Sequence, residues 1–157
     1  QMVKVEFTRY PSETASASGQ VVEVLGDPDD PQVDIEAVIF EHDLPRNFPA
    51  EVLAEADRIA AGGISADELA ERVDLRHLPL MTIDGETARD FDDAVALRQE
   101  GENVRLWVCI ADVAHYVPEG GCLDSQARER GTSVYFPGFC LPMLPEALSN
   151  GICSLNP

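Results

Sequence analysis

The sequence lacks the features that most quickly assign a class. No apolar run is long enough to span a bilayer and the start shows no secretory signal pattern, so we expect a cytoplasmic protein without a membrane partner. The cysteines form no Cys-x-x-Cys pair, and no histidine stands three or four residues from Cys109, Cys122, Cys140 or Cys153. A zinc site is therefore not indicated, and we expect reduced thiols.

Basic residues are also scarce. The 157 residues contain 11 Lys and Arg against 29 Asp and Glu, a net charge of −18. A free-standing nucleic-acid-binding domain normally needs a Lys/Arg surface for phosphate contacts, so the composition argues against one, and no DNA partner is expected. A Gly-x-Ser-x-Gly motif is absent as well, which argues against a serine hydrolase of that kind.

The length of 157 residues allows one ordinary domain or two small ones, with a hydrophobic share of 45% that is enough for a core. The chain begins at Gln1 and ends at Pro157, and we expect it to be a piece of a longer protein.

Alternating apolar residues at 3–8 and an apolar run at 21–25 predict two strands, and residues 33–40 predict a third. Three short strands fit part of a β-barrel such as an OB-fold, which needs about five.

We assign this partial barrel to residues 1–48 and a helical connector to residues 49–71. Pro49 suits a first helical turn, and Gly62-Gly63 ends the helix. Ser65 and Glu68 predict a capping box for a second helix at 66–73.

Residues 72–157 predict a β-rich region, so the expected fold class is α+β. The expected elements are a strand at 78–83, a hairpin of 94–98 and 104–111, a helix at 123–130 and a strand at 133–136. Both faces of the strand at 104–111 are largely apolar, which predicts that it is central in a sheet.

Four aspartates crowd one ten-residue stretch, Asp84, Asp90, Asp92 and Asp93. Carboxylates this close raise one another's pKa unless a positive charge lies between them, and a hard cation such as Mg²⁺, or alternatively Mn²⁺, is the simplest partner. A metal held by carboxylates with open positions suits phosphodiester hydrolysis. The alternative is an acidic loop in water, and the pattern alone divides evenly between the two.

Several other residues have two interpretations. Arg89 is either a counter-charge to the aspartates, which we favour, or a phosphate contact. Tyr135 is expected to be exposed and able to stack on a base, whereas Phe139 is expected in the core. His115 is interpreted as a surface or hydrogen-bonded residue without a catalytic role, and Asp112 as structural.

Taken together and in order, these motifs resemble one family. Residues 82–94 closely resemble the catalytic signature of the ribonuclease II/ribonuclease R (RNB) family, and the resemblance continues through 106–113, 130–137 and 141–155. The form of residues 131–137 is that of the ribonuclease R branch. Residues 1–60 resemble the last strands of the cold-shock (OB-fold) domain that precedes the N-terminal part of the RNB catalytic domain, here residues 72–157.

The resemblance implies a processive 3′→5′ hydrolytic exoribonuclease that acts on the single-stranded 3′ end of RNA, structured or not, releases nucleoside 5′-monophosphates and uses Mg²⁺. It implies metal ligation by Asp84, Asp90 and Asp93, a role in the chemical step for Asp92, and base stacking by Tyr135. We group Arg89 with Tyr135 as candidate substrate-binding residues. Since the family's catalytic domain supplies further catalytic residues beyond these, the chain alone is expected to be inactive or nearly so. The alternative is an acidic OB-containing interaction module without catalysis.

Overall fold

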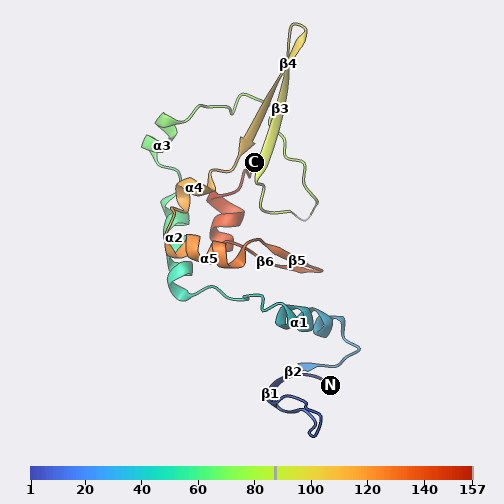
Figure 1. The fold of residues 1–157 in the computed structure, drawn as a ribbon. Helices are drawn as coiled ribbons and strands as arrows, with labels where there is room; N and C mark the ends of the chain where they lie inside the picture. Colours follow the sequence, from blue (N-terminus) through green and yellow to red (C-terminus); the bar gives the residue numbers. More distant parts are fainter. Residues whose placement is uncertain (87, 157) are drawn as a thin grey trace. The chain divides into compact units, whose positions relative to one another are not determined.

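The computed structural model describes residues 1–86 and 88–156. The chain separates into two compact units, Gln1–Arg46 and the residues from Asn47 onward, and Figure 1 labels their elements. Within the described residues, no helix is long and apolar enough to cross a membrane. Helices and strands are mixed, as the predicted α+β class requires.

The first unit contains an antiparallel pair of strands and one helix. Strand β1 (Met2–Arg9) pairs with β2 (Ser18–Gly26), which confirms the two predicted strands. The predicted third strand at 33–40 is wrong, because these residues form helix α1 (Pro31–Glu41). The Asp30 side chain accepts a hydrogen bond of 2.9 Å from the backbone N–H of Gln32, and Pro31 occupies the first helical position. A capping Asp followed by Pro starts a helix, and here this local signal outweighs the β propensity of the apolar residues.

The second unit begins with the two predicted helices. Helix α2 (Ala50–Gly62) starts after Pro49 and ends at Gly63, whose φ of 59° suits glycine. Helix α3 (Ala66–Glu71) is two residues shorter than predicted. Its cap is the predicted one, since the Ser65 hydroxyl accepts a hydrogen bond of 3.1 Å from the backbone N–H of Glu68.

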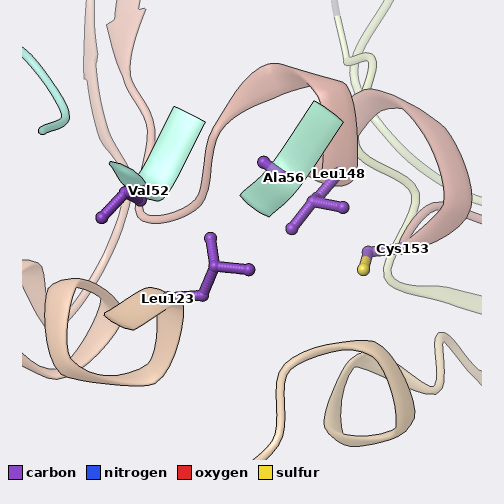
Figure 2. Close-up of a cluster of buried hydrophobic side chains, with 5 residues drawn as sticks. All are labelled: Val52, Ala56, Leu123, Leu148 and Cys153. Atoms are coloured by element: carbon purple, nitrogen blue, oxygen red, sulfur yellow. The ribbon is translucent and has the colours of Figure 1, made fainter. Parts of the chain in front are cut away.

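The core of the second unit joins helix α2 to segments much later in the chain. Figure 2 shows the buried cluster, in which each side chain is at most 3% exposed: Val52, Ala56, Leu123, Leu148 and Cys153. Leu123 belongs to helix α5 (Cys122–Arg130), which confirms the predicted helix at 123–130, and Leu148 to the helical turn η1 (Leu148–Ile152). The helix that the sequence suggested as a connector is therefore part of this core.

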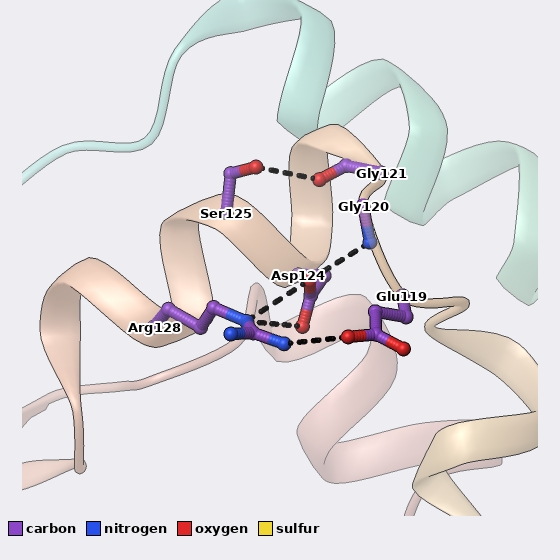
Figure 3. Close-up of polar contacts among 6 residues, drawn as sticks. All are labelled: Glu119, Gly120, Gly121, Asp124, Ser125 and Arg128. Carbon is purple, nitrogen blue, oxygen red and sulfur yellow. Dashed lines mark hydrogen bonds and ion pairs between the residues drawn. The ribbon is translucent and has the colours of Figure 1, made fainter.

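Polar contacts fix the start of α5 (Figure 3). The backbone N–H of Gly120 donates to Oδ2 of Asp124 at 2.9 Å, and Arg128 forms ion pairs of 3.2 Å with both Asp124 and Glu119. The helix ends at Gly131, with a φ of 73°. The chain then enters the hairpin of β5 (Val134–Phe136) and β6 (Phe139–Leu141).

The predicted hairpin in the middle of the unit is confirmed as β3 (Asp93–Glu100) and β4 (Asn103–Ile110), and the short helix α4 (Val113–Tyr116) follows it. The prediction that the second strand is central is wrong, because β4 pairs with β3 alone in the part of the chain that the structure describes. Apolar side chains on one face of β4 are more than half exposed, namely Leu106, Val108 and Ile110. The alternating pattern identified the strand, but burial of both faces needs other elements to cover them.

The predicted strand at 78–83 is also wrong. Only Met81 pairs, in an isolated antiparallel bridge with Val95 of β3. Pro79 has no N–H to donate to a ladder, and the backbone N–H of Leu80 bonds back to the carbonyl of Leu78. A single bridge therefore sets the position of the chain just before Asp84.

Candidate active site

The four aspartates lie on the loop before β3 and at its first residue. Asp84, Asp90 and Asp92 belong to the loop, and Asp93 begins the strand. Asp90 is half-buried, whereas Asp84, Asp92 and Asp93 are exposed. The carboxylates are thus accessible, as a binding site requires.

Backbone hydrogen bonds hold this loop from three directions. Met81 and Val95 exchange two bonds of 2.9 Å each, and the N–H of Ala111, just past β4, donates to the carbonyl of Asp92 at 2.8 Å. On the other side, the N–H of Leu155 donates to the carbonyl of Phe91 at 2.8 Å. The acidic segment is therefore positioned by chain before it, by β4 and by a segment more than 60 residues later.

A serine side chain adds a further contact to the same segment. The hydroxyl of Ser154 accepts a hydrogen bond of 2.8 Å from the N–H of Phe91 and donates one of 3.4 Å to the carbonyl of Arg89. Sequence reasoning missed Ser154 and Ala111. No local signal could have found them, because both act through backbone groups that are distant in sequence.

Tyr135 contacts one of the aspartates directly. It lies on β5, its side chain is 65% exposed as predicted, and its hydroxyl donates a hydrogen bond of 2.7 Å to Oδ2 of Asp90. This hydrogen bond, together with burial and the charge of Asp90, raises the pKa of Tyr135 to about 12. The tyrosine remains a neutral hydrogen-bond donor at physiological pH, with its ring open to solvent.

The surroundings of Tyr135 are partly as expected. The prediction that Phe139 is buried in the core is wrong, because it is 38% exposed. Its ring instead stacks on Phe136, with 5.1 Å between ring centroids. The turn between β5 and β6 contains Gly138, whose φ of 91° suits glycine.

Among the four aspartates, Asp92 has a pKa that is raised by its surroundings. Partial desolvation and then the charges of Asp90, Asp93 and Asp84 raise the pKa of Asp92. The carboxylates are near enough to repel one another, which is the condition that a cation would relieve. Their oxygens are the ligands that Mg²⁺ and Mn²⁺ prefer.

The four aspartates have the right kind of oxygen ligand for a hard cation, but their carboxylates are not arranged around one point. Within residues 1–86 and 88–156, no group of three or more His, Cys, Asp or Glu side chains is arranged to hold a metal ion. The donor set therefore fits a hard cation in type and charge, while the structure does not bring three of the carboxylates together.

Arg89 does not neutralise the cluster. Its side chain is exposed, and no ion pair with a carboxylate is formed in the described part of the chain, contrary to the interpretation that the sequence favoured. The guanidinium group beside four carboxylates is consequently available for other contacts.

A second polar network lies at the end of β4. Glu68 of α3, with a side chain 9% exposed, accepts hydrogen bonds from the Tyr116 hydroxyl at 2.6 Å and from Nε of Arg72 at 3.1 Å, and Nε2 of His115 lies 3.5 Å from its other oxygen. Arg72 also pairs with Asp112 at 2.8 Å. The network joins α3 to α4. Asp112 takes part through an ion pair, as the structural interpretation expects, and His115 is exposed, as the surface interpretation expects.

The comparisons with known proteins agree on one family. The RNB domain profile matches residues 72–157, and a cold shock domain profile matches residues 1–49. Ribonuclease R of Thermotoga maritima is 50% identical over 99% of this chain, and ribonuclease R of Escherichia coli is 48% identical over 99%. The chain spans 22% and 19% of the lengths of these two relatives.

Solved structures agree. RNase R of Mycoplasma genitalium in complex with double-stranded RNA superposes with a TM-score of 0.86 at 33% identity, over 99% of this chain and 27% of the other. Yeast Ssd1, a pseudonuclease, shares the fold with a TM-score of 0.63 at 20% identity, over 98% of this chain and 20% of the other. With the RNB domain matched over more than half of its residues and a cold-shock match before it, the chain belongs to the RNB domain family.

Proposed function

We propose that the intact protein carrying this chain is a processive 3′→5′ hydrolytic exoribonuclease of the ribonuclease R type, which releases nucleoside 5′-monophosphates. The observation that carries the proposal is the acidic segment with all four aspartates, held by β4 and joined to Tyr135 by a hydrogen bond of 2.7 Å. Relatives named ribonuclease R at about half identity support the same activity.

In this proposal each acidic residue has a role. Asp84, Asp90 and Asp93 would hold Mg²⁺, or Mn²⁺ in its place, and Asp92 would orient the attacking water. A bound divalent cation supplies charge that stabilises the attacking and leaving oxygens of an in-line displacement. Water is the nucleophile, which accounts for a site without an activated serine or cysteine.

The substrate would be the 3′ end of single-stranded or locally structured RNA, in the cytoplasm. Tyr135 presents an exposed ring on which the terminal base can stack, since every base has a π-face. Arg89, exposed beside the aspartates and without a carboxylate partner in the described chain, would contact a phosphate. RNA in complexes of the Mycoplasma genitalium RNase R supports RNA as the partner.

The alternative is an acidic interaction module without catalysis. It draws support from the net charge of −18 and from the open arrangement of the carboxylates. A fold does not by itself establish an activity, and yeast Ssd1, which shares this one, is named a pseudonuclease. The intact set of four aspartates favours the enzyme.

A Mg²⁺ titration of the isotopically labelled chain, followed by NMR, separates the two functions. The enzyme proposal expects saturable shifts confined to the amides of Asp84 and of residues 90–93. Uniform small shifts across the acidic surface would favour the interaction module. Digestion of 3′-labelled single-stranded RNA by the intact protein then tests direction and product, since nucleoside 5′-monophosphates released from the 3′ end are expected.

A further inference from the structure

Two side chains outside the loop that carries Asp90 and Asp92 bond to it, Tyr135 through the Asp90 carboxylate and Ser154 through the backbone. Phe91 lies between these two aspartates, and both of its backbone polar groups bond to the segment 154–155. Its carbonyl is bonded by the backbone N–H of Leu155, which any residue at that position would supply. Its N–H is bonded by the hydroxyl of Ser154, which only a hydroxyl-bearing residue can supply in the same way.

The hydroxyl of Ser154 both accepts and donates a hydrogen bond. A hydroxyl has one donor and two acceptor sites, so it can accept from Phe91 at 2.8 Å while donating to the carbonyl of Arg89 at 3.4 Å. These two contacts lie on either side of Asp90. The serine thus spans the turn of backbone from which the Asp90 carboxylate projects.

The remaining contacts of the loop explain why one hydroxyl could matter for function without being needed for folding. Asp92 is held through its carbonyl by Ala111, and Phe91 by Leu155, so the loop stays attached when the hydroxyl is removed. The peptide between Asp90 and Phe91 is the part that would lose its bond. This peptide carries the Asp90 side chain, whose carboxylate also accepts the hydrogen bond from the Tyr135 hydroxyl.

We propose that Ser154 is a positioning residue that sets the orientation of the Asp90 carboxylate for divalent-cation binding, and through it the rate of hydrolysis. The inference rests on the proposed function and deepens it, because it assigns a role to a residue outside the acidic segment. Ser154 does not touch the substrate or the cation. It acts through the backbone of residues 89–91.

The test compares three variants with the wild type in the intact protein. Ser154→Ala removes the hydroxyl, Ser154→Thr keeps it, and Ser149→Ala removes a hydroxyl of the neighbouring helical turn that contacts Asn150 and not the acidic loop. The measurements are Mn²⁺ affinity by electron paramagnetic resonance, kcat and KM on single-stranded RNA, hydrogen exchange of the Phe91 amide, and Tm as a check of folding.

Loss of one hydrogen bond predicts a Mn²⁺ affinity about five- to tenfold weaker in Ser154→Ala, with faster exchange of the Phe91 amide. We expect kcat to fall and the KM for RNA to stay unchanged, because the serine does not contact RNA. Ser154→Thr should restore the affinity and kcat, and Ser149→Ala should leave them at the wild-type level.

Three results would overturn these statements, two the positioning role and one the proposed function. The first is a Ser154→Ala variant in which the Phe91 amide exchanges its hydrogen faster while Mn²⁺ affinity and kcat stay at the wild-type level. The serine would then be structural only, and the positioning role would be wrong. If Ser154→Thr behaves like Ser154→Ala despite an unchanged Tm, the hydroxyl is not the cause and the inference also fails. If the wild type itself binds no Mn²⁺ and does not degrade RNA, the proposed function fails, and the positioning role with it.

Discussion

The hydroxyl of Tyr135 donates a hydrogen bond of 2.7 Å to Oδ2 of Asp90, which joins the β5–β6 hairpin to a loop 45 residues earlier. One side chain therefore presents two chemical groups to one place, a hydroxyl to the acidic segment and a ring to solvent. If the ring stacks on the terminal base, this bond would set the distance between the base and the carboxylates. The two groups can be tested separately.

Substitution of Tyr135 separates ring from hydroxyl. Tyr135→Ala should weaken binding of single-stranded RNA by about 5- to 100-fold, the usual contribution of one base–aromatic stack. Tyr135→Phe should keep RNA affinity within about twofold, since the ring is retained. Fluorescence anisotropy with a labelled oligonucleotide measures both affinities. Equal loss in the two variants would show that the hydroxyl, and not stacking, carries the contact.

Asp92→Asn should abolish hydrolysis, by at least about 100-fold in kcat, because a neutral amide cannot orient and polarise water as a carboxylate does. RNA affinity should be unchanged or slightly higher, since one negative charge is lost near the phosphates. Glu102→Gln, at the exposed turn of the β3–β4 hairpin, is the charge-matched control. Loss of RNA binding along with activity would instead assign Asp92 a role in folding or docking.

Removal of divalent cations should stop the reaction. We expect EDTA to abolish RNA degradation by the intact protein, and excess Mg²⁺ or Mn²⁺ to restore it. The same cations should raise the Tm of the chain, because binding to the folded state relieves repulsion among the four carboxylates. A Tm that responds equally to matched ionic strength of NaCl would indicate general screening and not a site.

The network around Glu68 predicts a specific pH dependence of stability. The hydrogen bond from Tyr116, assisted by Arg72 and His115 and opposed by desolvation, lowers the pKa of Glu68 from its ordinary value of 4.5. A lowered folded-state pKa contributes stability that is present above pH 4.5 and is lost as the pH falls through the lower folded-state value. Tm values of the wild type and Glu68→Gln from pH 7 to pH 3 should converge at the acid end. A difference that stays constant with pH would contradict this assignment.

Core packing of the second unit predicts a large effect of one substitution. Leu148 is 0% exposed within the cluster that joins α2 to α5, so Leu148→Ala should lower the free energy of unfolding by about 2–5 kcal/mol. Leu97→Ala, at a leucine that is 64% exposed on β3, should change it by less than about 0.5 kcal/mol. Urea denaturation followed by circular dichroism measures both free energies, and similar losses would contradict a core that depends on Leu148.

Predictions from local sequence patterns are confirmed where an element is determined by interactions within a few residues. The helix at Ala50–Gly62, the capping of α3 by Ser65 and the β3–β4 hairpin follow from capping residues, glycines and apolar spacing within a few residues. The error at residues 33–40 has the same origin. Asp30 and Pro31 form a helix start, a local signal that the prediction of a strand at 33–40 did not take into account.

Patterns that depend on burial failed for a different reason. One apolar face of β4 and the ring of Phe139 have the hydrophobicity of core residues, yet they are exposed, whereas Trp107 and Cys109 on the other face are half-buried. Hydrophobicity indicates that a side chain gains free energy when it is covered, but only other elements can cover it. The failure at residues 78–83 has another cause. Pro79 has no N–H to donate, and these residues form a single bridge, between Met81 and Val95.

The sequence by itself determined the candidate chemistry, because the residue types, their spacing and the family resemblance were enough to propose Asp84, Asp90, Asp92, Asp93 and Tyr135 as candidate site residues. Only the tertiary structure decided how that chemistry is held. It placed the Tyr135 hydroxyl on Asp90, the N–H of Ala111 on Asp92 and the hydroxyl of Ser154 on Phe91. These partners are separated by 19 to 63 residues, and hydrogen bonds between groups so far apart form only when the chain around them has folded.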